Sequence, residues 1–385
     1  MVVRWSCLLP CILALIGCSR ITGSPALPTG ASIQSDSQTY NFETLYRFTN
    51  PAGGAIPVGA LLGLNGALFG TTYQGGDGKP GSGVVFEITS SEEKVVHAFT
   101  NSKQDGKGPY AGLTDVDGTF YGTTQEGGEY GLGTVFSVTA SGTEKVVFSF
   151  NGQDGSYPRA AVIDVNGLLY GTTYYGGAYA YGTVFSITTG GSETVLHSFK
   201  GGKDGALPLD NLIALQNTFY GTTSLGGVSN DGTIFKIGAS GKENVLHDFK
   251  GDPDGAQPFA ALTDVNGVLY GTTYEGGTHN LGTVFEVAGG KEKVLYSFAG
   301  GDDGASPYAG LTLLNGTLYG DTSRGGGSDN YGTLYTVTPS GAEKVIFRFN
   351  GGESGRVPYA SLTAVNGALY GTTLFKGGTI YELSP

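Results

Sequence analysis

The sequence contains little sulfur, little charge and few of the residues that commonly do catalytic chemistry. Its 385 residues include three cysteines, one tryptophan, one methionine and four histidines. All three cysteines lie within the first 18 residues, so the rest of the chain has no thiol and cannot form a disulfide. The sequence also contains no phosphate-binding loop, nucleophile elbow or metal-binding His/Cys motif. It therefore offers no local signature of an enzyme.

Charged residues make up only 14% of the chain, and the formal net charge is −12. An acidic chain repels the phosphate backbone, so we expect no nucleic-acid partner. Hydrophobic residues make up 39%, with 23 tyrosines and 20 phenylalanines. This content is too apolar and too aromatic for a disordered chain.

The N-terminus predicts export and lipid anchoring. Arg4 precedes a short apolar run over 7–17, and Leu15-Ile-Gly-Cys18 resembles the bacterial lipobox. We therefore expect a lipoprotein signal peptide over 1–17 and a lipidated Cys18, which attaches the protein to a membrane of the bacterial cell envelope (the outer membrane or the cell surface). A plain secretory signal is the alternative. Residues 18–39 are rich in Ser, Thr, Gly and Pro and predict a flexible tether, leaving 40–385 as the folded part.

One string of residues recurs seven times at intervals of about fifty residues. Its form is Leu-Tyr-Gly-Thr-Thr, and in every copy a proline precedes the glycine by thirteen residues. The glycines are Gly70, Gly122, Gly171, Gly221, Gly271, Gly320 and Gly371. Strings of the forms Gly-Thr-Val-Phe and Glu-Lys-Val-Leu-His-Ser-Phe also occur seven times each. A fixed period of this length is typical of repeat architectures.

Each repeat predicts four β-strands. The strings are β-branched and aromatic, turn residues separate them, and Asn-Gly pairs such as Asn266-Gly267 suit a tight hairpin. No helical period interrupts the pattern. The sequence therefore predicts an all-β fold, a seven-bladed β-propeller with four antiparallel strands per blade.

The order of the strings predicts how the ring closes. The folded part begins with an isolated fourth strand at 43–48 and ends with a third strand at 378–383. Every blade has four strands only if this N-terminal strand completes the last blade, which also removes an unpaired sheet edge. An open β-solenoid is the alternative, and it would not need such matching ends.

The repeat resembles the GloVer tandem repeat of exported bacterial proteins that carry various anchors. Tyr270-Gly-Thr-Thr-Tyr-Glu-Gly-Gly277 followed by Gly282-Thr-Val-Phe285 carries the resemblance, which covers roughly residues 41–385. The sixth copy departs from it with Asp321 in place of threonine, and the seventh has a shortened loop. The Gly-Gly doublet is also similar to kelch propellers, although the kelch tryptophan is missing. The resemblance implies a propeller and export, and it implies no chemistry.

Loops of variable length point to one face of the propeller as the binding surface. We call top face the side that carries the loops between strands two and three and the loops that lead from strand four into the next blade. Variable loops on a rigid scaffold commonly carry binding residues. The candidates on this face are Tyr130, Tyr174, Tyr175, Tyr179, Tyr181, Tyr274 and Asn280. Such aromatic and amide groups suit sugar rings or protein partners, whereas the alternative is that the tyrosines fill gaps between blades.

The innermost strand departs from its repeat in two adjacent blades. The residue after the repeated proline is aromatic or aliphatic in six blades, but it is Arg159 in the third. Small residues follow in six blades, whereas the fourth has Asp210 and Asn211. We expect Arg159 and Asp210 to face one cavity, close enough to share a ligand or each other. Sequence drift at a solvated rim is the alternative.

Histidine and aspartate residues recur in the repeat without a catalytic pattern. His97, His197 and His247 occupy a position on the fourth strand that other blades give to Tyr or Phe, so we interpret them as packing residues; His279, in a top loop, has no identifiable partner. Asp105, Asp154, Asp204, Asp254 and Asp303 begin Asp-Gly-x-x-Pro segments and predict Asx turns. We expect no cofactor. Calcium at Asp252 and Asp254, or at Asp302 and Asp303, is an alternative, although two carboxylates fall short of the six to eight oxygens that calcium prefers.

These features favour a binding, adhesion or scaffold module for a glycan or protein at the cell envelope, and we expect a monomer. The alternative is an extracellular polysaccharide lyase or hydrolase that uses carboxylates on the top face. A passive envelope component is the third hypothesis.

Overall fold

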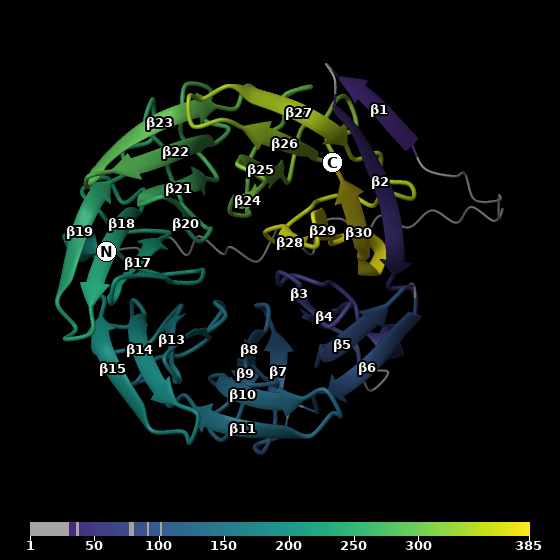
Figure 1. Cartoon of the computed structure of the whole chain (residues 1–385). Coiled ribbons are helices and arrows are strands. Elements are labelled where there is room, and N and C mark those ends of the chain that lie inside the picture. Colours follow the sequence, from purple (N-terminus) through teal and green to yellow (C-terminus); the bar gives the residue numbers. More distant parts are fainter. Residues whose placement is uncertain (1–30, 36–37, 77–80, 91, 101) are drawn as a thin grey trace, which may run out of the picture. The chain divides into compact units, whose positions relative to one another are not determined.

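A computed structural model describes residues 31–35, 38–76, 81–90, 92–100 and 102–385. The signal peptide expected over 1–17 and Cys18 lie outside these residues. Seven sheets surround a central axis, each with its first strand innermost and its fourth outermost (Figure 1). This arrangement confirms the predicted seven-bladed β-propeller with four antiparallel strands per blade.

The strands follow the predicted repeat. Blade 1 consists of β3 (Leu62–Leu64), β4 (Ala67–Thr72), β5 (Val84–Thr89) and β6 (Glu92–Ala98). Blade 2 consists of β8 (Thr114–Val116), β9 (Thr119–Gly127), β10 (Thr134–Thr139) and β11 (Glu144–Ser149), and β7 (Gly106–Pro109) also pairs with β9. Blade 3 consists of β12 (Ile163–Val165), β13 (Leu168–Thr173), β14 (Thr183–Thr188) and β15 (Glu193–Ser198). Blades 4 and 5 consist of β16 (Ile213–Leu215), β17 (Thr218–Thr223), β18 (Thr233–Gly238) and β19 (Glu243–Asp248), and of β20 (Thr263–Val265), β21 (Val268–Thr273), β22 (Thr283–Ala288) and β23 (Lys291–Ser297). Blade 6 consists of β24 (Thr312–Leu314), β25 (Thr317–Thr322), β26 (Thr333–Val337) and β27 (Glu343–Arg348).

The seventh blade combines the two ends of the chain. It contains β28 (Thr363–Val365), β29 (Ala368–Thr373) and β30 (Thr379–Ser384), and its fourth strand is β2 (Gln38–Arg47), which pairs antiparallel with β30. The predicted closure of the ring is confirmed. A further strand, β1 (Ala31–Ser35), pairs with β2 on its outer side. The tether expected over 18–39 therefore overlaps the folded part, because 31–35 pair with β2 and β2 itself begins at Gln38.

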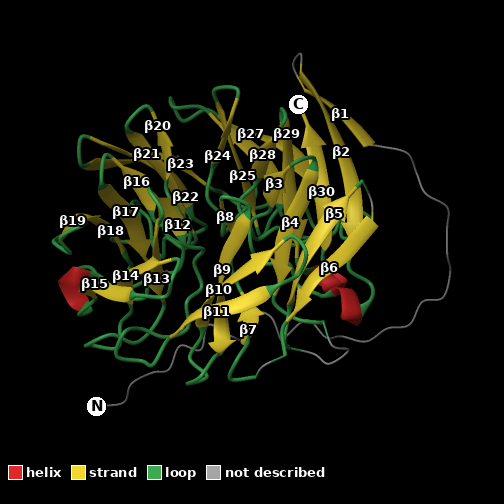
Figure 2. Cartoon of the chain, turned by 60° about the horizontal axis from the view of Figure 1, so that its bottom comes forward, coloured by secondary structure: helices red, strands yellow, loops and turns green. Residues whose placement is uncertain are grey.

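In the part of the chain that the structure describes, helical structure is confined to three short turns, η1 (Pro51–Gly53), η2 (Gly202–Asp204) and η3 (Phe375–Gly377). Figure 2 shows how little of the fold is helical. Among the described residues, no helix has the length and apolarity needed to cross a bilayer. The described fold is thus built from strands and loops.

The repeated prolines and glycines join neighbouring blades. A Cβ added to Gly232 would lie 2.6 Å from Cδ of Pro258, the proline that opens the next blade. The same close approach joins Gly378 to Pro57 across the closure of the ring. Glycine is needed here because any side chain would push adjacent blades apart, which explains why both residues recur at a fixed spacing.

The two threonines of the Thr-Thr string have separate tasks. The first donates its hydroxyl hydrogen to a carbonyl oxygen in the next blade, as Thr71 does to Ala111 at 2.7 Å. The second remains within its blade, as Thr124 does with Thr134 at 2.7 Å. Both hydroxyl groups are buried and hydrogen-bonded, so the string satisfies the polar groups it places in the core.

A β-bulge interrupts the pairing of strands three and four in every blade. In blade 4, His247 lies opposite Ile234 and Glu243 lies opposite Ile237. Residues three apart on a strand point to opposite faces, so His247 and Glu243 also point to opposite faces. Without the bulge, residues four apart would share a face. On each fourth strand, the side chains at these two positions therefore face opposite neighbours, one the preceding blade and the other the next blade.

Candidate functional site

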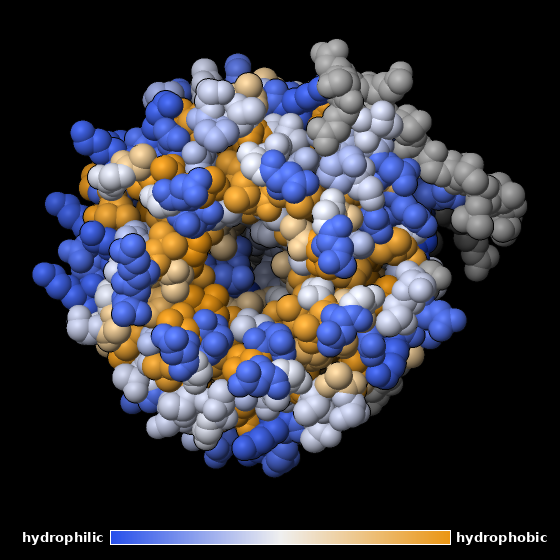
Figure 3. Space-filling view, in the orientation of Figure 1, coloured by the Kyte–Doolittle hydropathy of each residue, from blue (hydrophilic) through white to orange (hydrophobic). Residues whose placement is uncertain are grey.

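The residues that follow the seven prolines meet at the centre of the ring. They line one cavity of about 180 Å³ together with neighbouring residues of the innermost strands. In chain order they are Val58, Tyr110, Arg159, Leu209, Phe259, Tyr308 and Tyr359. In a space-filling view, the ring is hollowed at its centre and apolar residues gather around the hollow (Figure 3). Six of these seven residues are aromatic or aliphatic, and Arg159 of the third blade is the exception.

Aromatic contacts fix one side of this cavity. Tyr308 stacks on Tyr359 with ring centroids 3.8 Å apart, and Phe259 lies 5.1 Å from Tyr308. The hydroxyl groups of Tyr110 and Tyr359 are hydrogen-bonded to each other. Burial raises the pKa of Tyr308 and of Tyr359 well above the usual value, so both phenols are neutral near pH 7. These rings form a rigid wall that carries polar hydroxyl groups.

Arg159 provides the positive charge of the cavity. Its guanidinium lies 4.2 Å from the ring centroid of Tyr174 and 5.3 Å from that of Tyr110. Cation–π contacts of this kind hold a guanidinium in place without neutralising it. Its Nε is buried and has no hydrogen-bond partner. Arg159 is therefore a positioned cation with an unused donor.

Asp210 and Asn211 connect three blades at the cavity wall. Asp210 accepts hydrogen bonds from the backbone N–H of Asn211 at 2.7 Å and of Ala261 at 2.9 Å, and Asn211 accepts one from Ala161 at 2.6 Å. Burial nevertheless raises the pKa of Asp210. Arg159 and Asp210 line the same cavity, but the Asp210 carboxylate is bonded to backbone amides and the Arg159 guanidinium lies over tyrosine rings. Asp210 is also the one carboxylate among the described residues that line this cavity.

The other candidate tyrosines divide into a buried and an exposed set. Tyr174 is only 2% exposed beneath Arg159, and Tyr274 packs on Phe259 with centroids 5.1 Å apart. These two support the cavity wall. The exposed set, on loops between strands two and three, comprises Tyr130, Tyr175, Tyr179 and Tyr181.

Asn280 belongs to the loop structure. Its side-chain oxygen accepts a hydrogen bond from Gly276 N at 2.9 Å, and its φ of 55° is left-handed. Asn230 makes the equivalent bond to Gly226. The side-chain oxygen of Asn280 therefore closes its own loop.

The two loop sets assigned to the top face lie together. Isolated bridges pair the loop that enters a blade with the loop between its strands two and three, as Ser156 pairs with Tyr175 and Ala256 with Glu275. A Cβ on Gly226 would lie 2.6 Å from the backbone of Gly205, which explains the first glycine of the Gly-Gly doublet. The variable loops thus rest on a backbone framework common to the blades.

Comparison with known proteins identifies the repeat. The sequence matches the Gloeobacter/Verrucomicrobia repeat over residues 15–183 and 161–384. The chain belongs to this repeat family. No curated protein matches it.

Solved structures similar to this Gloeobacter/Verrucomicrobia repeat protein share its fold. The computationally designed protein Ika8 is 14% identical, with 88% of this chain and 99% of Ika8 aligned and a TM-score of 0.53. PorZ of Porphyromonas gingivalis, described as an essential bacterial surface component of the type-IX secretion system, is 13% identical, with 83% of this chain and 46% of PorZ aligned and a TM-score of 0.55. At these identities the likeness concerns the fold alone.

Sequence reasoning missed one set of residues in this repeat protein. His97, His197 and His247 were interpreted as packing residues, yet each hydrogen-bonds through Nε2 to an aspartate that opens the next blade. These partners are Asp105, Asp204 and Asp254. The Asx-turn prediction for the aspartates describes only part of their role, because Asp254 Oδ2 also lies 3.0 Å from His247 Nε2. The sequence contains a signal for these pairs, because each histidine precedes its aspartate by eight or seven residues.

Proposed function

We propose that this repeat protein is a binding module whose ligand, a glycan or a protein, engages the mouth of the central cavity. The observation that carries the proposal is the guanidinium of Arg159, which the rings of Tyr174 and Tyr110 hold in place and which is the one cation among the described residues that line this cavity. Flat apolar rings with polar edges suit sugar rings and side chains, and a fixed cation orients a polar or anionic group. The cavity, at about 180 Å³, is smaller than the roughly 300–1,000 Å³ of small-molecule sites. It therefore accepts one end of a larger ligand, such as a terminal sugar or a side chain.

Binding fits the cavity better than hydrolysis. Glycoside hydrolysis commonly uses a pair of carboxyl groups, whereas the described lining offers Asp210 alone. That carboxylate is engaged by two backbone N–H groups. The exposed tyrosines of the top face, Tyr130, Tyr175, Tyr179 and Tyr181, extend the contact surface for a larger ligand.

A glycan array and a pull-down from envelope extracts test this function. Arg159→Leu is the sharpest variant, because leucine occupies the equivalent position, Leu209, in the next blade. We expect the variant to fold and to lose at least ten-fold in affinity for any ligand found. Lys145→Leu removes a positive charge from the exposed surface of β11 and should bind as the wild type does. Absence of binding in both assays, or equal binding by Arg159→Leu, would contradict the proposal.

We also propose that the protein acts as a monomer at the bacterial cell envelope, attached to the outer membrane or cell surface through lipid on Cys18. The lipobox-like Leu15-Ile-Gly-Cys18 supports the anchor.

A further inference from the structure

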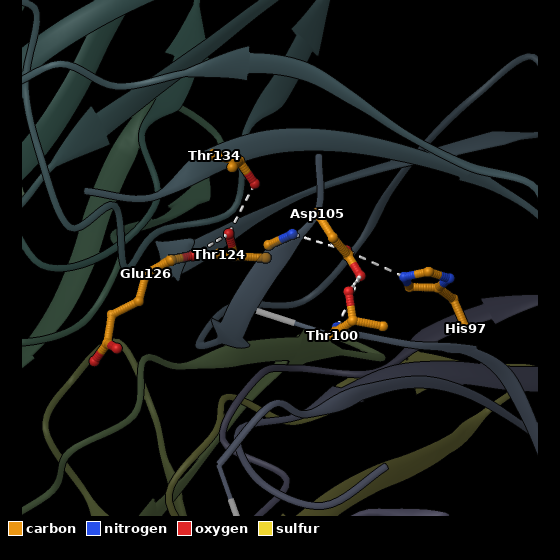
Figure 4. A network of polar contacts seen from close by, with 7 residues as sticks. His97, Thr100, Asp105, Thr124, Glu126 and Thr134 are labelled. Carbon is orange, nitrogen blue, oxygen red and sulfur yellow. Dashed lines mark hydrogen bonds and ion pairs between the residues drawn. The ribbon is translucent and has the colours of Figure 1, made fainter. Parts of the chain in front are cut away.

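Three interfaces between blades contain the same cluster of a histidine, an aspartate and a glutamate. The clusters are His97 with Asp105 and Glu144, His197 with Asp204 and Glu243, and His247 with Asp254 and Glu292. In each, one ligand atom from every residue lies within 4.8 Å of the other two. Figure 4 shows His97 directed at Asp105, which Thr100 also contacts.

The bulge in the fourth strand creates these clusters. It turns the histidine toward the next blade and the glutamate toward the preceding blade. The histidine of one blade therefore meets the glutamate of the following blade, and the aspartate comes from the loop that connects them. The ring repeats this geometry, so the same chemistry appears wherever the repeat supplies a histidine.

The cluster of His247, Asp254 and Glu292 has the dimensions of a metal site. His247 Nε2 lies 3.0 Å from Asp254 Oδ2 and 3.7 Å from Glu292 Oε2. Ligands about 2.1 Å from a tetrahedral Zn²⁺ are separated by about 3.4 Å. The imidazole is held edge-on to Phe249, with centroids 4.8 Å apart. Small shifts of these side chains would therefore give a three-ligand N/O/O site.

Burial and charge at this cluster also call for a cation. The Glu292 side chain is only 8% exposed, and its Oε1 is buried without a hydrogen-bond partner. Two carboxylates balance the charge of one divalent ion, and the imidazole supplies a nitrogen ligand.

We propose that the three His–Asp–Glu clusters each bind a divalent transition-metal ion, with Zn²⁺ as the ion best suited to the ligands, and that these ions join adjacent blades. The three sites are His97/Asp105/Glu144, His197/Asp204/Glu243 and His247/Asp254/Glu292. Each site takes its ligands from two consecutive blades. Bound metal therefore stabilises the ring, and it is independent of the ligand proposed for the central cavity.

The other interfaces provide natural controls. Phe148 replaces the histidine beside Asp154 and Glu193, and Tyr296 replaces it beside Asp303, to which its hydroxyl donates at 2.7 Å. Between the sixth and seventh blades, Phe347 of β27 stacks on Phe42 of β2, with centroids 4.0 Å apart, where the other clusters have histidine and glutamate. The interface therefore folds with phenylalanine at the histidine position, and His→Phe is a tolerated change.

The experiment measures bound zinc in the full chain after stripping with chelator, reloading with ZnCl₂ and removing excess ion. Because cysteine thiolates are also zinc ligands, any contribution of the N-terminal cysteines is cancelled by taking the number of sites from differences between variants. We expect His247→Phe to bind one equivalent fewer than the wild type, and the triple His→Phe variant at 97, 197 and 247 to bind three fewer. His279→Phe, in an exposed loop outside the clusters, should bind as much as the wild type. Zinc should raise the unfolding temperature of the wild type more than that of the triple variant.

A second variant covers the case in which His247→Phe does not fold. Glu292→Gln keeps the side-chain shape but removes its charge, and we expect at least a ten-fold weaker affinity at one site, in line with the effect of losing a ligand or its partner. Equal zinc content in wild type and triple variant, or equal affinity in Glu292→Gln, would overturn the proposal. The clusters would then be hydrogen-bonded contacts between blades only.

Discussion

Asp321 is the residue whose replacement should most clearly stabilise the propeller. It occupies the position of the first threonine in the Thr-Thr string of blade 6, where Thr272 of blade 5 donates a hydrogen bond to Ala309 O at 2.9 Å. Asp321 is 0% exposed, and neither carboxylate oxygen has a hydrogen-bond partner. The Asp321→Thr substitution restores the repeat residue and its donor.

The magnitude follows from the lost and gained hydrogen bonds. A buried polar group without a partner costs about 1–3 kcal/mol, and a made bond contributes about 0.5–1.5 kcal/mol. Because the side chains are similar in size, we expect no large packing change. The free energy of unfolding of Asp321→Thr should therefore exceed that of the wild type by about 1.5–4.5 kcal/mol near pH 7, from these two terms.

This gain should depend on pH. Burial raises the pKa of Asp321 well above its usual value, so the folded protein keeps the proton after the unfolded chain has released it. The free energy of unfolding of the wild type therefore falls as pH rises above about 3.9. Urea unfolding at pH 5 and pH 8 should show a larger advantage for Asp321→Thr at pH 8.

A matched substitution tests the reasoning in the opposite direction. Thr272→Asp places the same carboxyl in blade 5 and should destabilise the protein by a similar amount, increasingly so at higher pH. If Asp321→Thr unfolded at lower urea than the wild type at pH 8, the Asp321 carboxyl would be stabilised by an interaction of its own, and the reasoning would be refuted. Tyr335 and Tyr381 would be the first partners to examine, because the charge of Asp321 contributes to raising the pKa of both phenols.

Three further predictions concern ring closure, pH and the anchor. Phe42→Ala removes a 7%-exposed ring that stacks on Phe347 and should cost about 3–5 kcal/mol in thermal or urea unfolding, whereas a loss below about 1 kcal/mol would mean that β2 contributes little to the ring. Burial and the charge of Asp154 raise the pKa of Glu193 from 4.5 to about 7. The wild type should therefore lose stability relative to Glu193→Gln as the pH rises from about 4.5 to 7. Parallel curves of unfolding free energy against pH for the two proteins would contradict this. Cys18→Ala should move the protein from the membrane fraction to the soluble fraction, and a variant that still sediments with membranes would show that Cys18 is not the anchor.

The number of blades and the closure of the ring could be read from the sequence. Seven copies of each strand string, with a fourth strand at the start and a third at the end, leave one arrangement in which every blade is complete. The structure confirms it through the pairing of β2 with β30. The additional strand β1 could not be predicted, because 31–35 has no repeat counterpart and its pairing depends on the exposed edge that β2 offers.

Part of the candidate site could also be predicted from the sequence. Arg159 and Asp210 stand out in the sequence because they break the repeat. Equivalent positions of the repeated blades lie at similar distances from the central axis, so both residues line one cavity. Their lack of direct pairing depends on local bonds: Asp210 is held by the amides of Asn211 and Ala261, and Arg159 by the rings of Tyr174 and Tyr110.

The sequence by itself determined the repeat, the strand order and the ring, because these follow from hydrophobic pattern and turn chemistry within each fifty-residue unit. Only the tertiary structure decided which side chains meet between units. Histidine and glutamate lie four residues apart on one strand, and simple alternation would place them on one face. The bulge separates them, so that His247 meets Glu292 of the next blade rather than Glu243 of its own. A one-residue shift in pairing reverses the direction of every later side chain on the strand, and that shift becomes visible only when both strands are in place.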